Sequence, residues 1–161
     1  MPNSAWSNPT GPKYRERLWP AAWVFIGTAL VIPASLLVFL PISQLAGVIS
    51  AVVLYGGIVI ALLATTPTVE VTEDEFTAGR ARLPRSVIAG VGAYTGAEAT
   101  AERGTRLDGR AWLLLRGWIP GIVHVTLNDP RDPTPYWLVS TRHPEELAAA
   151  LTGANASPVK G

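Results

Sequence analysis

Residues 18–64 read LWPAAWVFIGTALVIPASLLVFLPISQLAGVISAVVLYGGIVIALLA and contain no charged side chain. They form two apolar runs of 23 residues each, 18–40 and 42–64, on either side of Pro41. As an α-helix, each run would reach about 34 Å, against a hydrocarbon core of about 30 Å. Both runs are apolar on every side, whereas a core helix of a soluble protein normally keeps a polar side. This stretch therefore predicts two transmembrane helices.

The link between the two runs is very short. Pro41 cannot continue the first helix, and only Ser43 and Gln44 nearby are polar. Such a link makes the two helices antiparallel neighbours, so we expect residues 18–66 to form a transmembrane hairpin. Two interpretations stay open, because little polar sequence marks the far side: the hairpin crosses the bilayer, or it enters and returns on one side. The length of each run favours crossing.

Basic side chains flank the hairpin at both ends. Those before it are Lys13, Arg15 and Arg17, and those after it are Arg80, Arg82 and Arg85. Because cytoplasmic flanks of membrane helices are rich in Lys and Arg, both termini are expected in the cytoplasm, with the protein in the cell (plasma) membrane. Trp19 and Trp23 suit the interfacial belt of the bilayer.

The two runs contain no ionisable side chain, which argues against a transporter or channel acting alone. Pro33 is expected to kink the first helix. Gly57 and Ala61 lie four residues apart on the second helix, where small side chains permit close approach of another helix. That helix is either the first helix of the hairpin or part of another protein.

Composition excludes several classes of function. Residues 70–161 carry ten basic and eleven acidic side chains, so they lack the basic excess of a nucleic-acid binder. The absence of cysteine excludes disulfides, thiolate chemistry and cysteine metal sites. The two histidines, His124 and His143, have no partners at metal-ligand spacing, and no nucleophile with a neighbouring base is visible. We therefore expect no catalytic residue, no metal and no cofactor, and no enzyme.

Residues 67–153 read as a β domain. Segments 68–72 and 122–128 alternate apolar and polar side chains, which is typical of half-buried strands, and the second places His124 on the outward face. Residues 96–110 are a long polar segment, and AEATAERGTRLDGRAW (97–112) reads as a solvated β-hairpin loop.

A helix is predicted over residues 144–151. Pro144 suits the first helical position, two acids follow it, and Gly153 lies just past the end. The fold class is thus an α+β membrane protein: a transmembrane helical hairpin, then a small antiparallel sheet or partial barrel of six or seven strands with one C-terminal helix. Residues 1–17 are expected to be a disordered basic segment and residues 154–161 a disordered tail.

Three segments resemble a known family: RERLW (15–19), ARLPRSVIAGV (81–91) and DPRDPTPYWLVSTRHPEELAAAL (129–151). Over residues 13–152 the chain resembles small, two-pass actinobacterial membrane proteins of unknown function. The residues that match the family pattern most specifically are Trp137, Ser140, Arg142, Pro144 and Leu147. The layout of the β part is also similar to bacterial pleckstrin-homology-like (PH-like) domains carried on membrane hairpins, which implies a C-terminal helix that plugs a barrel. The family implies no activity.

Several side chains are candidates for contacts with lipids or proteins. Arg80, Arg82 and Arg85 either touch anionic lipid headgroups or form an ordinary basic flank. Trp118 lies at a predicted turn and, if exposed there, would mark a bilayer or partner contact. Arg142 is expected to pair with a carboxylate or cap a turn.

These observations favour a non-catalytic integral membrane protein that presents a cytoplasmic PH-like domain as a protein- or lipid-binding or scaffolding module. The alternative is an accessory subunit of a larger membrane complex, assembled through the hairpin. An enzyme acting on lipid ranks third, with His124 and His143 as the residues to change. The expected partners are the lipid bilayer and either another membrane protein or an anionic lipid, without nucleic acid.

Overall fold

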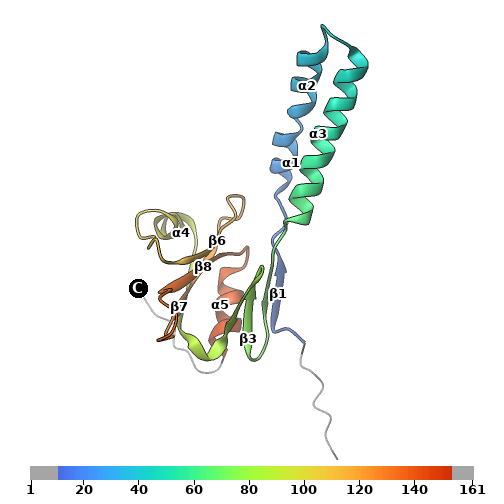
Figure 1. The fold of residues 1–161 in the computed structure, drawn as a ribbon. Helices are drawn as coiled ribbons and strands as arrows, with labels where there is room; N and C mark the ends of the chain where they lie inside the picture. Colours follow the sequence, from blue (N-terminus) through green and yellow to red (C-terminus); the bar gives the residue numbers. More distant parts are fainter. Residues whose placement is uncertain (1–10, 154–161) are drawn as a thin grey trace, which may run out of the picture. The chain divides into compact units, whose positions relative to one another are not determined.

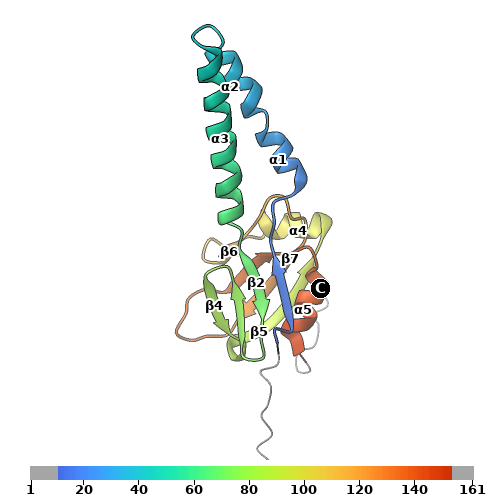
Figure 2. The same cartoon turned by 90° about the vertical axis from the view of Figure 1, so that its right-hand side faces the viewer.

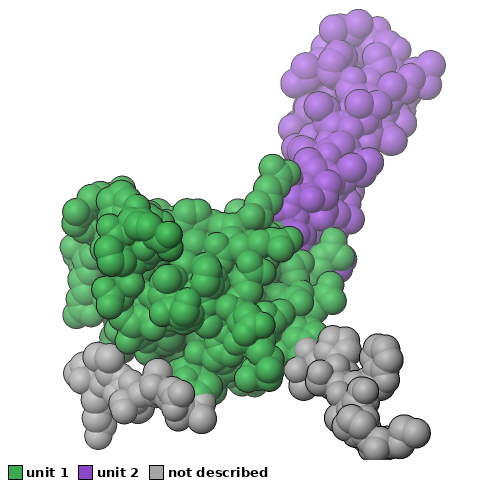
Figure 3. All heavy atoms as spheres, turned by 60° about the horizontal axis from the view of Figure 1, so that its bottom comes forward, with its two compact units in different colours: residues 1–18, 67–161 green, residues 19–66 purple. Residues whose placement is uncertain are grey.

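The computed structural model describes residues 11–153, so the disorder predicted for residues 1–10 and 154–161 lies outside the described residues. The chain forms two compact units (Figure 3). Residues 19–66 form one unit, which we call the helical hairpin. The described residues of the other unit are 11–18 and 67–153, and we call this unit the β domain. The helical hairpin therefore interrupts the β domain in sequence.

The described part of the β domain contains two four-stranded sheets (Figure 1). The first has the order β1-β2-β3-β4 and is antiparallel throughout. The second has the order β5-β7-β8-β6, and its edge strand β6 runs parallel to β8. The strands are β1 (Tyr14–Arg17), β2 (Thr68–Val71), β3 (Glu75–Ala78), β4 (Ala81–Pro84), β5 (Ile88–Tyr94), β6 (Trp112–Leu114), β7 (Ile122–Leu127) and β8 (Tyr136–Ser140). A short 3-10 helix, η1 (Arg85–Val87), joins the two sheets.

Strand β1 corrects the prediction that residues 1–17 are disordered. It pairs with β2 from Tyr14 opposite Val71 to Arg17 opposite Thr68, and Figure 2 shows the two strands side by side. The sequence YRER shows no apolar alternation, because its more buried positions are Tyr14 and Glu16 and its exposed positions are both arginine. The strand is therefore defined by its partner β2 and not by its own hydrophobic pattern.

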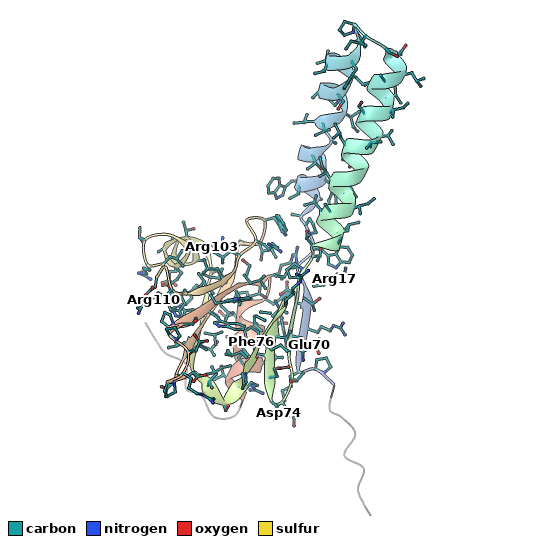
Figure 4. The ribbon with its side chains drawn as sticks, viewed as in Figure 1. Arg17, Glu70, Asp74, Phe76, Arg103 and Arg110 are labelled. Atoms are coloured by element: carbon teal, nitrogen blue, oxygen red, sulfur yellow. The ribbon has the colours of Figure 1, made fainter. Side chains whose placement is uncertain are left out.

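One apolar core joins both sheets to the C-terminal helix α5 (Pro144–Thr152). Its fully buried members include Val69 and Phe76 from the first sheet, Val125 from the second and Leu147 from α5. Figure 4 shows Phe76 on β3 inside the β domain. Full burial of one such side chain contributes about 1.5–3 kcal/mol. The core thus depends on segments far apart in sequence.

A second helix, α4 (Gly96–Arg103), replaces the solvated hairpin loop predicted over residues 96–110. It buries Ala99 and Glu102, and Ala99 packs against Ile122 and Leu138 of the second sheet. Only two of its eight residues are buried, so the helix has no broad apolar face that would predict it from the sequence. The predicted loop is therefore wrong for residues 96–103, where the polar and glycine-containing sequence is helical.

The helical hairpin contains α1 (Ala22–Thr28), α2 (Val31–Phe39) and α3 (Gln44–Ala64). The first helix starts later than the predicted residue 18, because Leu18 is buried in the β domain and its N–H donates to the carbonyl of Pro67 at 3.0 Å. The break between α1 and α2 has a clear cause. Pro33 has no N–H for the Ala29 carbonyl, which accepts from Ile32 instead. The predicted kink at Pro33 is therefore present.

Close helix contact within the hairpin occurs at Gly47 and not at the predicted pair. A Cβ added to Gly47 would lie 3.3 Å from the Cβ of Phe39 and 3.4 Å from Leu36. A Cβ added to Gly57 would meet nothing within 4 Å, and both Gly57 and Ala61 are exposed. Of the two interpretations left open for this pair, packing against the first helix does not occur, since α1 diverges from α3 beyond the break, as Figure 2 shows, and contact with another protein stays a prediction.

By length and composition, two helical stretches of the described chain could cross a membrane, namely Ala22–Phe39 and Gln44–Ala64. Their mean hydropathies are 2.2 and 2.4. The interruption between α1 and α2 lies inside the first stretch. The predicted pair of apolar helices is thus present, with one of them broken.

Candidate functional site

Glu16 is the centre of a polar cluster that ties β1 to the segment between β8 and α5. The hydroxyl of Tyr14 donates to its Oε2 at 2.7 Å, and that of Thr141 donates to the same atom at 2.5 Å. The backbone N–H of Arg142 donates to Oε1 at 3.1 Å, and the Arg142 guanidinium lies 3.5 Å from that atom. Both oxygens of a nearly buried carboxylate are thus satisfied, as burial requires.

The Tyr14 phenol is a weaker acid in this cluster than in water, although it donates a hydrogen bond to Glu16. Its burial raises the pKa of the phenol above the ordinary value, and the nearby Glu16 carboxylate raises it further, while the hydrogen bond with Thr141 acts in the opposite direction. The phenol therefore stays neutral and holds its hydrogen bond. We call Tyr14, Glu16, Thr141 and Arg142 the Glu16 cluster. Its hydrogen bonds hold β1 against the segment between β8 and α5.

The five family-pattern residues surround this cluster or lie in the core. Ser140 is fully buried, and its Oγ accepts the N–H of Arg116 at 3.0 Å. Pro144 begins α5 and packs so closely that a Cβ on Gly121 would lie 3.1 Å from it. Trp137 stacks on Trp112 with ring centroids 4.2 Å apart. The remaining two are Leu147, in the core, and Arg142, paired with Glu16.

A second polar cluster joins α4 to the second sheet. The Glu102 carboxylate, nearly buried, lies 3.2 Å from the His124 Nδ1 through one oxygen and 3.2 Å from the Arg106 guanidinium through the other. The His124 ring stacks on Tyr136 with centroids 4.0 Å apart. A hollow of about 90 Å³ beside it is lined by Gly90, Val91, Gly92, Tyr94, His124 and Thr126.

Chemically, an imidazole oriented by a carboxylate is the usual arrangement of a general base. Here the Glu102 carboxylate also joins α4 to His124 of β7. Arg103, the last residue of α4 and labelled in Figure 4, makes a second attachment, because its guanidinium donates to the carbonyls of Ile119 and Pro120 at 2.9 and 2.6 Å. Within residues 11–153, no three His, Cys, Asp or Glu side chains gather as a metal site. The cluster is best explained as the attachment of α4 to the sheet.

A larger groove runs between β5 and α5. Its volume is about 410 Å³. It is lined by Val91, Gly92 and Ala93 from β5 and by Glu145, Ala148, Ala149 and Thr152 from α5. The groove combines strand backbone, small apolar side chains, the Thr152 hydroxyl and the Glu145 carboxylate, a mixed lining of the kind found in ligand-binding grooves.

The three arginines after the hairpin differ in their roles. Arg85 donates to the carbonyls of Thr72 and Glu73, both at 3.1 Å, and to those of Ala150 and Leu151 at 3.1 and 2.9 Å. It thereby caps the C-terminus of α5, as basic side chains often do. Arg82 is exposed and lies 3.7 Å from Glu75, and Arg80 is exposed. Contact with lipid headgroups stays a prediction for Arg80 and Arg82.

Trp118 is half-buried and packs against the core of the β domain. The Arg116 guanidinium lies 5.8 Å from its ring centroid. Its indole nitrogen is buried without a hydrogen-bond partner among the described residues. Trp118 is therefore only partly exposed, and its contact with a bilayer or a partner stays a prediction.

Sequence reasoning missed the acidic centres of both polar clusters. Glu16 lies among three basic residues and reads as part of a solvated flank, although it belongs to the RERLW segment of the family resemblance. Glu102 carried a usable signal, because Arg106 follows it at the spacing of helical neighbours and Ala99 precedes it by three. The sequence could not show that Glu102 contacts His124 or that Glu16 contacts Thr141, because each contact depends on where folding places the strands.

Comparison with known proteins gives one match. The model of a family described as "Protein of unknown function (DUF3093)" matches residues 13–151. No curated protein and no solved structure matches the chain. The matched residues run from just before β1 to the last turn of α5, and they include the helical hairpin, the Glu16 cluster and every lining residue of the β5–α5 groove except Thr152. The chain therefore belongs to the DUF3093 family of proteins of unknown function.

Proposed function

We propose that this protein is a non-catalytic, two-pass membrane protein whose β domain is a cytoplasmic binding module. One observation carries the proposal, namely where exposed apolar side chains lie. Among the described residues, every large hydrophobic side chain that is exposed belongs to the hairpin, except Leu113. Each candidate span is only 11% buried, so neither acts as a core helix within this chain. A bilayer would cover this surface.

The β1–β2 pairing supports a hairpin with both ends on one side of the membrane. Arg17 is paired with Thr68, so the chain leaves the β domain and returns to it at adjacent positions. Two residues that pair in one sheet cannot lie on opposite sides of a bilayer. The basic flanks then favour the cytoplasm as that side.

A PH-like identity for the β domain is part of the proposal. Its support is the arrangement of two sheets around one core, with α5 packed against strands of both. This is the place that a helix plugging a barrel would take. The parallel strand β6 and helix α4 are additions to a purely antiparallel layout. Binding is favoured over catalysis because the Glu16 and Glu102 carboxylates are occupied by partners that hold the fold together.

The chain has no cysteine, so topology can be tested with single introduced thiols. We would introduce Ser43→Cys in the α2–α3 turn and, as the matched site, Ala97→Cys on the exposed face of α4. A membrane-impermeant maleimide should label Ser43→Cys in intact cells, whereas Ala97→Cys should react only in inverted vesicles. Labelling of Ser43→Cys from the cytoplasmic side alone would mean a re-entrant hairpin. Labelling of Ala97→Cys in intact cells would overturn the proposed orientation.

An accessory subunit that assembles through the hairpin is the second candidate. The observation that favours it is the exposure of Gly57 and Ala61, because the contact inside the hairpin is made elsewhere, at Gly47. Gly57→Leu should then dissociate a native complex in mild detergent, while Val53→Leu, also on exposed α3 surface, should not. If Gly57→Leu leaves the complex intact, this candidate fails.

A further inference from the structure

The second sheet has a hollow on the face opposite the main core of the β domain. Val125 of β7 belongs to that core, so its neighbours His124 and Thr126 lie on the other face, since successive side chains of a strand alternate. The residues that pair with them on β5 are Gly92 and Gly90. The hollow, of about 90 Å³, lies where these two glycines supply no side chain. A glycine inside a strand often marks a place that a ligand approaches closely.

The residues that line the hollow carry three polar side-chain groups without a hydrogen-bond partner in residues 11–153. These are the hydroxyls of Tyr94 and Thr126 and the Nε2 atom of His124. The Tyr94 hydroxyl lies 2.9 Å from the point where a Cβ on Gly92 would be, so the phenol covers the glycine that pairs with His124. A concave surface with a few convergent polar groups is typical of a ligand site.

Glu102 determines which nitrogen of His124 is available. Its Oε1 accepts from the Arg106 guanidinium, and its Oε2 lies 3.2 Å from the His124 Nδ1. Because an ionised carboxylate only accepts hydrogen bonds, Nδ1 carries the proton of the neutral ring, and Nε2 is left as an acceptor. The stack on Tyr136, with ring centroids 4.0 Å apart, holds the imidazole in place. A group that binds Nε2 must therefore donate a hydrogen bond to it.

The lining of the hollow argues against charged ligands. None of its residues is Asp, Glu, Lys or Arg, so a bound charge would have no counter-charge there. An ionised phosphate or carboxylate also lacks the proton that Nε2 of His124 needs, and an ammonium group cannot accept from the hydroxyls of Tyr94 and Thr126. A hydroxyl group both donates and accepts, so it satisfies all three side chains.

We propose that the hollow binds one hydroxyl-bearing end of a carbohydrate or similar polyol, through a hydroxyl that donates to Nε2 of His124 and accepts from Tyr94 or Thr126. The inference rests on the proposed function and names the ligand class of the binding module. The hollow of about 90 Å³ is larger than the roughly 30 Å³ of one water molecule and well below the roughly 300 Å³ at which a site encloses a whole ligand. Only one end of the ligand therefore enters. The same chemistry occurs in a soluble sugar and in the sugar headgroup of a lipid.

Histidine NMR on the full chain in lipid nanodiscs tests the proposal, because the chain contains only two histidines. His143 is exposed before α5 and serves as the internal control. Nitrogen-15 shifts of the His124 ring should show the proton on Nδ1. The probes are glucose, galactose and glycerol, with inorganic phosphate and methylammonium as charged probes. Nanodiscs with and without a galactosyl lipid distinguish a lipid headgroup from a soluble sugar.

Substitutions locate the binding in the hollow. Tyr94→Phe and Thr126→Ala each remove one hydroxyl and should weaken polyol binding about fivefold. Their matched controls are Tyr55→Phe in α3 and Thr105→Ala, at an exposed position just after α4. Gly90→Val fills the hollow and should abolish binding, and its φ is not positive, so the strand backbone accepts a side chain there. Circular dichroism would verify that each variant folds.

A polyol should shift the His124 signals in a saturable way and leave those of His143 unchanged. A response to the galactosyl lipid alone would identify a lipid headgroup as the ligand, and a response to free sugars would identify a soluble one. An equal response to phosphate or methylammonium would overturn the proposal, as would undiminished binding by both Tyr94→Phe and Thr126→Ala. If no probe shifts His124, the inference fails, whereas the proposed function fails only if the chain also purifies from the membrane without any protein or lipid partner.

Discussion

The helical hairpin and the β domain place apolar side chains in opposite ways. In the hairpin, Leu37 and Ile42 are exposed by 73% and 76%, while the polar Ser35 is buried. In the β domain, Phe76 and Leu147 are fully buried. An apolar side chain therefore does not define a core by itself. Its contribution to the free energy of unfolding depends on its surroundings. These are other side chains in the β domain and, in the proposed setting, lipid around the hairpin.

The same truncation should have very different effects in the two units, and this is the largest expected difference. Leu147→Ala removes a fully buried side chain and should cost about 2–5 kcal/mol of unfolding free energy. Leu37→Ala should cost less than about 0.5 kcal/mol, because its surroundings are equally apolar before and after the change. Denaturant unfolding of the full chain in micelles, followed by fluorescence of the core tryptophans, measures both. Equal losses would refute the contrast.

The Glu16 cluster extends the comparison to the strand that precedes the hairpin. Glu16→Gln should destabilise the β domain by about 2 kcal/mol, because Oε2 accepts two hydroxyl hydrogen bonds and Oε1 pairs with Arg142. Arg15→Gln, which removes an exposed pair with Glu70, is the control and should cost under about 0.5 kcal/mol. The same unfolding experiment applies. A loss for Glu16→Gln as small as that of the control would show that β1 is held by β2 alone.

Two glycines of α3 sharpen the comparison within the hairpin. Gly47→Leu should destabilise the hairpin by about 1 kcal/mol or more, because the new side chain meets Phe39 and Leu36. Gly57→Leu should leave the isolated chain unchanged, since nothing lies within 4 Å of its added Cβ. Thermal loss of helical circular dichroism in detergent measures both variants. A larger effect at Gly57 in the monomer would contradict the helix packing described here.

The smallest effect concerns pH. The pKa of Tyr14 is raised on folding, mainly by burial, so the folded state retains a proton that the unfolded state loses above about pH 10. The stability contributed by Tyr14 is therefore complete below that pH and declines as pH rises further. Tyr14→Phe should flatten this alkaline decline, and unfolding curves taken from pH 8 upward would measure it. If stability fell with pH equally steeply in Tyr14→Phe and in the unchanged protein, Tyr14 would not be the cause of the alkaline decline.

Patterns local in sequence predicted much of the fold. The charge-free stretch gave the two apolar helices, and Pro33 gave the break between α1 and α2. Alternation placed β2 and β7, and Pro144 with Gly153 marked the two ends of α5. Each of these signals comes from residues within one element, so no other part of the chain is needed to recognise it.

The features that were missed depend on partners distant in sequence. Strand β1 exists because β2 pairs with it across the whole hairpin, and Glu16 is buried because Thr141 and Arg142 meet it. The short helix α4 buries only Ala99 and Glu102, and Ala99 packs against residues of β7 and β8. Gly57 was chosen over Gly47 because spacing alone cannot show where two helices approach. The groove is invisible in sequence, since its walls come from β5 and α5, which only folding brings side by side.

By itself, the sequence determined that residues 18–64 are too uniformly apolar for water and that a mixed β domain follows them, because hydrophobicity and periodicity are properties of neighbouring residues. Only the tertiary structure decided that the hairpin is an insertion between two paired strands, that two acidic residues are largely buried with partners, and that α5 packs beside β5, at the end of the second sheet. The physical reason is that pairing, burial and edges arise from segments brought together by folding, which no local pattern records.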